Sequence, residues 1–220
     1  MVMFLRGRSD RSAEMPGELL RMLANGRRAF DVATAALLDG ASPDVAGRHL
    51  REAAQRVNDG QRKVRRELVV HAAVEGVTDT KLLVYMSIVK DAARVGDSAR
   101  VIYELSALGV NFSNAPDREE MVGYRDRISA MISDAAGILA ADDVDAANVA
   151  LAAADVMLDE FDEKVTALFG CDRPGGEAVP RALLYRHFKR VVAHLMNLLS
   201  AVVMPVDGLD YYDGPRKGRI

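Results

Sequence analysis

Tryptophan is absent from this sequence of 220 residues, only one cysteine is present, and aromatic residues make up 5% of the chain. The lone Cys171 cannot form an internal disulfide, which favours a reducing compartment. No apolar run approaches the roughly 18–20 residues that span a bilayer, and the apolar part of residues 1–11 is too short for a signal peptide. A net charge of −3 argues against a general nucleic-acid-binding protein. We therefore expect a soluble cytoplasmic protein.

The abundant residues favour helices over sheets, since Ala, Val, Leu, Met, Arg, Asp and Glu dominate the composition. Helix caps and breakers recur at even intervals. Ser42, Pro43 and Asp44, for example, combine an N-cap, a proline at the first helical position and an acidic first turn. The pattern predicts an all-α protein with six helices. Their expected ranges are 18–38, 43–73, 80–109, 117–139, 145–169 and 180–203, with a loop at 171–179 before the last helix.

The two halves of the sequence follow the same plan. Residues 37–58 and 90–101 align with residues 138–159 and 186–197. Such a repeat indicates an internal duplication, with each half forming an antiparallel three-helix bundle. The alternative is one irregular helical bundle without true repeats. The expected division is 16–112 for the first bundle, 113–204 for the second, and 205–220 for a C-terminal tail without helical periodicity.

The segment 81–105 carries an unusual charge. At helical spacing Asp91 interrupts an apolar stripe, and Arg94 and Asp97 follow within two turns. A buried carboxylate is costly unless it is paired, hydrogen-bonded or bound to a metal. One interpretation is a buried Asp–Arg network between helices, and the other is a metal or partner site. We expect Asp91, Arg94, Asp97 and Arg190, which aligns with Arg94, to form the polar focus of the molecule.

A second group of carboxylates lies on the predicted fifth helix. Asp155, Asp159 and Asp162 are spaced i, i+4 and i+7 beside an apolar stripe. Like charges at this spacing repel each other, and hard cations such as Mg²⁺, Mn²⁺ or ferric iron use such oxygen ligands. The alternative is a solvated acidic face.

Catalytic motifs are not found. The sequence has no GxxxxGK[ST] phosphate loop, no GxGxxG after a strand and no GxSxG. His71, His187 and His194 are helical histidines of a kind that is usually packed or exposed, and Glu67 and His71 do not have the Glu-x-x-His spacing of di-iron bundles. We therefore expect a protein that is not an enzyme.

Two helical patterns resemble the repeats of the PhoU family of bacterial and archaeal phosphate regulators. Those repeats read roughly as I-N-x-x-E-x-x-I-x-x-E, followed by D-L-E-R-I-G-D-H-A-x-N-I-A-E. The first half matches at Val57, Asn58, Val64, Glu67, Asp91, Arg94, Gly96, Asp97, Ala99 and Glu104. The second half matches at Asp155, Asp159, Arg190, His194 and Asn197. The resemblance covers residues 18–203. The start of the chain and its length also look like the related phosphate-transporter accessory proteins.

The resemblance implies two tandem three-helix bundles and a regulatory role. PhoU proteins partner phosphate transporters and sensor histidine kinases, and some bind metal clusters through E(D)xxxD motifs. Here only the Asp155–Asp159 motif is intact. Other motif positions hold Ala54, Asn58, Ala93, Lys189 and Ala193. We expect one divalent or ferric metal ion, or none, and the candidate ligands are Asp97, Asp155, Asp159 and Asp91.

The leading hypothesis is a PhoU-like regulator of phosphate transport and phosphate-starvation signalling that acts by binding proteins. Its expected partners are phosphate-transporter components or a sensor histidine kinase. It would reach the membrane only through that partner, and a homodimer stays open. The alternatives are a carboxylate-bridged metal-binding enzyme in a helical bundle and a purely structural oligomerisation module.

Overall fold

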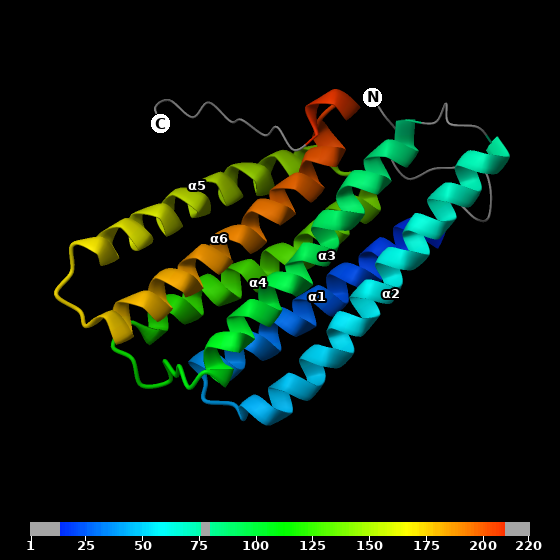
Figure 1. Cartoon of the computed structure of the whole chain (residues 1–220). Helices are drawn as coiled ribbons and strands as arrows, with labels where there is room; N and C mark the ends of the chain where they lie inside the picture. Colours follow the sequence, from blue (N-terminus) through cyan, green and yellow to red (C-terminus); the bar gives the residue numbers. More distant parts are fainter. Residues whose placement is uncertain (1–13, 76–79, 210–220) are drawn as a thin grey trace.

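The computed structural model describes residues 14–75 and 80–209, and nearly all of them lie in six long helices (Figure 1). The helices are α1 (Glu14–Leu38), α2 (Pro43–Glu75), α3 (Thr80–Ala107), α4 (Arg118–Ala141), α5 (Val144–Phe169) and α6 (Gly175–Val203), followed by the short 3-10 helix η1 (Val206–Gly208). These described ranges contain no strand. The predicted all-α fold with six helices is confirmed.

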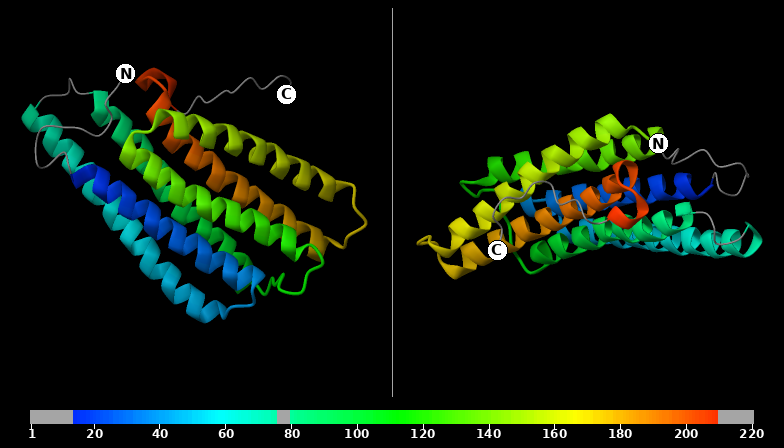
Figure 2. Two further views of the ribbon diagram at one scale, coloured as in Figure 1. Left: turned by 180° about the vertical axis from the view of Figure 1, so that it is seen from behind. Right: turned by 90° about the horizontal axis from the view of Figure 1, so that it is seen from above.

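The helices pack in two sets of three. α1, α2 and α3 pack on one another, α5 packs on α6, and α4 packs on α6 and more lightly on α5. The two sets lie side by side through contacts of α3 with α6 and of α1 with α4, which leaves α2 and α5 at opposite edges (Figures 1 and 2). Their apolar side chains form one continuous core. The ring centroids of Phe30 on α1 and Phe188 on α6, for example, are 5.7 Å apart.

Local sequence sets several of the helix ends. At the α4–α5 junction Asp142 has a φ of 55°, in the left-handed region that ends helices. Asp143 then caps α5, because its side chain accepts a hydrogen bond of 3.0 Å from the backbone N–H of Ala146. The predicted break at this aspartate pair is confirmed.

The predicted start of the sixth helix is wrong. α6 begins at Gly175, inside the expected loop, and Pro180 lies within the helix. Glycine and an internal proline both disfavour a helix, so contacts with the rest of the protein must offset them. Arg181 supplies such contacts, because its guanidinium donates to the carbonyl oxygen of Glu177 at 2.9 Å and pairs with Asp117.

The helix boundaries follow the register of the repeat. α2 begins at Pro43 and α5 at the aligned Val144, and α3 and α6 end at the aligned Ala107 and Val203. α2 has 33 residues, seven more than the 26 of α5. Residues 69–75 therefore prolong α2 beyond the part that has a counterpart in α5.

None of the helices in the described ranges is long and apolar enough to cross a membrane. The N-terminal stretch 1–11, a cap at Asp79 and the tail beyond residue 209 lie outside the described residues.

Candidate functional site

A buried polar cluster joins α3 to α6 where the two halves meet. Asp91 is 2% exposed. Its Oδ1 accepts hydrogen bonds from Nδ1 of His194 at 2.8 Å and from Nδ2 of Asn197 at 3.3 Å. A carboxylate can only accept, which assigns the proton of His194 to Nδ1. These contacts satisfy the carboxylate that the sequence places in an apolar stripe, and they fix α3 against α6.

The repeat relates this cluster to a second set of positions in the same contact. Asp91 aligns with His187, and His194 aligns with Ser98. Within the described part of the chain, Oγ of Ser98 and Nδ1 of His187 are buried without a hydrogen-bond partner. Burial lowers the pKa of His187, and the charge of Arg190 lowers it further. One of the two related sites is therefore satisfied and the other is not.

The predicted polar focus is only partly assembled. Asp91 is buried, whereas Arg94, Asp97 and Arg190 are exposed. Among the residues that the structure describes, Asp91 is bonded to His194 rather than to an arginine, so an Asp–Arg network is not formed. The cause is the position of Arg94 on the outward face of α3. The sequence signal was His194 and Asn197, spaced i, i+3 on an otherwise apolar helix.

The acidic face of α5 meets a lysine from α6. Nζ of Lys189 lies 2.5 Å from Oδ1 of Asp162, and Nη1 of Arg186 lies 3.9 Å from the same oxygen. Asp155 is half-buried and Asp159 is exposed. Lys189 occupies a position where the PhoU pattern has an acidic residue, so a cation stands where a further carboxylate ligand would be needed.

The predicted carboxylate cluster does not form. α6 packs against both α3 and α5, so it separates Asp97 from Asp155 and Asp159 (Figure 1). Within the ranges 14–75 and 80–209, no three His, Cys, Asp or Glu residues could hold a metal ion together. Asp91 is bonded to His194 and Asn197. The expectation that Asp97 joins the α5 carboxylates is thus corrected, and a metal ion on Asp155 and Asp159 alone stays a prediction.

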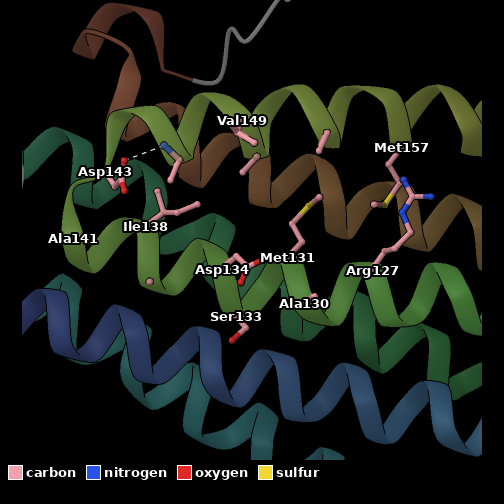
Figure 3. A pocket seen from close by; sticks show the side chains of 14 residues that line it. Arg127, Ala130, Met131, Ser133, Asp134, Ile138, Ala141, Asp143, Val149 and Met157 are labelled. Carbon is pink, nitrogen blue, oxygen red and sulfur yellow. Dashed lines mark hydrogen bonds between the residues drawn. The ribbon is translucent and has the colours of Figure 1, made fainter.

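An open groove runs between α4 and α5 (Figure 3). It has a volume of about 790 Å³, and its walls are largely apolar. Arg127 lies at one end, and Asp143 lies at the other (Figure 3). Small or flexible side chains contribute most of the lining, among them Ala130, Gly137, Ala146, Val149, Ala153 and Met157. Sequence reasoning missed this groove, because an alanine-rich helix face is also typical of a packed core.

Charged contacts hold α4 against the first bundle. Asp39 pairs with Arg118 at 2.5 Å and with Arg125 at 2.6 Å. Nε of Arg118 also donates to the carbonyl oxygen of Leu38 at 2.7 Å, which caps the C-terminal end of α1. These contacts draw α4 towards α1, and the gap on its other side is the α4–α5 groove.

A buried ion pair links the start of α4 to α6. Arg181 is 4% exposed, and its guanidinium donates to both oxygens of Asp117 at 2.7 and 2.9 Å. It also lies over the ring of Phe112, with 5.0 Å to the centroid. The hydrogen bonds from Arg181 hold the pKa of Asp117 below its usual range, although burial opposes this. The pair is a structural support and lies apart from the groove.

The comparison with solved structures identifies the architecture. The chain is similar to the crystal structure of PhoU from Pseudomonas aeruginosa, with a TM-score of 0.75 and 20% sequence identity over 87% of this chain and 95% of that chain. The fold is PhoU-like. No family model and no curated protein sequence matches the chain. The PhoU-like fold places the α3–α6 cluster at the contact between the halves and the α4–α5 groove on the second half.

Proposed function

We propose that this protein is a PhoU-like regulator of phosphate transport and phosphate-starvation signalling, which acts in the cytoplasm by binding other proteins. The observation that carries the proposal is the likeness of nearly the whole chain to PhoU, with 87% of this chain and 95% of that chain covered. The similarity extends over both three-helix bundles and not over one half alone.

The partner would be a component of a phosphate transporter or a sensor histidine kinase, and the α4–α5 groove is the proposed place of contact. A helix binds a groove by laying an apolar face into it. The apolar walls suit such a face, and the exposed Asp134 and Asp143 favour a partner helix with a basic residue near one end. Arg127 favours an acidic residue at the other end.

A deletion strain with a reporter for phosphate-starvation genes tests the proposal. We expect the reporter to be expressed at high phosphate in the deletion strain and repressed again by the wild-type gene. Ala153→Arg, which places a long charged side chain in the groove, should fail to restore repression. The matched control is Ala152→Arg, because Ala152 is equally exposed on α5 but does not line the groove. Normal regulation in the deletion strain contradicts the proposal.

Metal dependence is a separate part of this proposal, with Asp155 and Asp159 as the ligands that the chain offers. Metal analysis of the purified protein, with the double substitution Asp155→Ala and Asp159→Ala as reference, measures it. Bound metal in the wild type that the double variant loses supports the site, and equal metal content in both proteins rejects it.

A further inference from the structure

The outward face of α2 changes character near its C-terminal end. Arg62, Arg65 and Arg66 are exposed on this face. One turn further, the exposed residues are Val69 and Val74, at 65% and 74% of their surface. The solvent-facing side of a helix is normally polar, so a basic stretch followed by exposed valines needs an explanation.

The adjacent start of α3 shows the same order. Leu83 and Met86 are 56% and 42% exposed, and the exposed Lys90 and Arg94 follow within two turns. The two helices lie side by side at one end of the molecule (Figures 1 and 2). We call the exposed apolar residues of this end the hairpin tip; they are Val69, Val70, Val74, Leu83 and Met86. They make up five of the thirteen exposed large apolar side chains in the described ranges, which marks a patch rather than scattered exposure.

The fold itself does not require this part of α2. Leu68 is the last fully buried residue of the helix, and residues 69–75 are the seven by which α2 exceeds α5. The valines of this extension therefore face solvent without completing the core, and a surface that binds something outside the chain accounts for them.

The charge beside the hairpin tip indicates an anionic surface. Four of the five charged residues between positions 62 and 74 are basic, and the single acid, Glu67, pairs with Lys63 at 3.8 Å. Among the residues that the structure describes, Arg65 and Arg66 have no acidic partner. Their charge is thus available to negatively charged groups.

We propose that the hairpin tip docks the protein onto an anionic lipid bilayer. At 1.5 Å per residue, the valines extend roughly 4–12 Å beyond Arg66 along the helix axis, which matches the roughly 5–10 Å depth of interfacial side chains. Arg65 and Arg66 then lie at the level of the lipid phosphates. Apolar ends on two neighbouring helices, with basic residues behind both, suit a planar charged surface better than a pocket of a partner protein. This inference does not depend on the proposed role in phosphate regulation.

Sedimentation of the full-length protein with vesicles tests the inference. We expect binding to phosphatidylcholine vesicles that contain phosphatidylglycerol, little binding to phosphatidylcholine alone, and weaker binding at high salt. The double substitution Arg65→Gln and Arg66→Gln should lower the partition coefficient roughly 25-fold. Val69→Gln with Val74→Gln should lower it about tenfold.

Matched variants separate the hairpin tip from general surface effects. Arg48→Gln with Arg51→Gln removes two exposed arginines from the other end of α2, and Val149→Gln with Val156→Gln removes two exposed valines from α5. Both controls should bind vesicles as the wild type does. The inference is overturned if wild-type protein does not sediment with the anionic vesicles, or if the controls lose as much binding as the tip variants. A chain that binds only after removal of residues 1–13 also overturns it, because its own N-terminal segment would then occupy the tip.

Discussion

The two three-helix bundles follow one plan, yet their first two helices meet in different ways. In the first bundle Gly60 of α2 is buried against α1, and a Cβ at this position would lie 2.7 Å from Cγ of Met22. In the register of the repeat Gly60 aligns with Phe161 of α5, whose ring centroid lies 4.9 Å from that of Tyr124 on α4. A glycine permits close approach of two helices, whereas two facing rings keep them apart.

This difference indicates how one bundle is closed and the other keeps a binding surface. Beyond the rings, the side chains between α4 and α5 are too short to fill the gap, so the α4–α5 groove opens there. The first bundle has its exposed apolar surface at the end, in the extension of α2. Each half therefore offers a different surface, one a groove and the other a tip.

The contact between the halves shows the same asymmetry, and breaking it should have the largest effect. Asp91→Ala removes the acceptor of two buried hydrogen bonds and leaves His194 without its partner. We expect the free energy of unfolding in urea to fall by about 3 kcal/mol. The related position gives the control: Ser98→Ala removes a buried hydroxyl that has no partner among the described residues, so stability should stay equal or rise by up to about 1 kcal/mol. Equal losses in both variants would contradict the comparison.

The closed and open helix pairs respond in opposite ways to a larger side chain. Gly60→Leu should lower the free energy of unfolding by about 2–3 kcal/mol, because the new side chain overlaps Met22 and Glu18. Gly137→Leu has no atom within 4 Å of the added Cβ and replaces a poor helix former, so we expect a gain of about 0.5–1 kcal/mol. Thermal unfolding followed by circular dichroism measures both, and a loss in Gly137→Leu comparable to that in Gly60→Leu would show that the groove is packed.

Much of the fold could be predicted from the sequence, because caps, breakers and apolar periodicity are local. The start of α6 could not. The contacts of Arg181 with Asp117 come from a helix that lies far away in the sequence, and they override the local preference of two glycines and Pro180.

The candidate site was less predictable for the same reason. Asp91 stood out because a carboxylate in an apolar stripe needs a partner, but the choice of His194 over Arg94 depends on which face α6 presents. The convergence of Asp97 with the α5 carboxylates failed because helix order in space is not written in spacing. The α4–α5 groove arises from how far two helices stand apart, which no motif records.

The link between α4 and α6 should make stability depend on acid. The pKa of Asp117 is lowered in the folded protein, mainly by the hydrogen bonds from Arg181. Its contribution is therefore present above the unfolded pKa near 3.9 and is lost as the pH falls through the lower folded value. Asp117→Asn should reduce the free energy of unfolding by about 1–2 kcal/mol at neutral pH and show a weaker decline below about pH 4. Asp134→Asn, exposed on α4, is the control and should change stability by less than about 0.5 kcal/mol.

The smallest expected effect concerns His187, the position that aligns with Asp91. Its pKa is lowered by burial and by Arg190, so the unfolded chain takes up a proton before the folded one as the pH falls below about 6.5. The stability linked to His187 is present above that value and decreases towards the folded pKa. His187→Leu should therefore lose less stability than the wild type between about pH 7.5 and about pH 5.5 in urea unfolding. His49→Leu, at an exposed histidine of α2, should keep the wild-type dependence, and identical slopes for His187→Leu and the wild type would show that the buried ring does not titrate as a neutral partner of this contact.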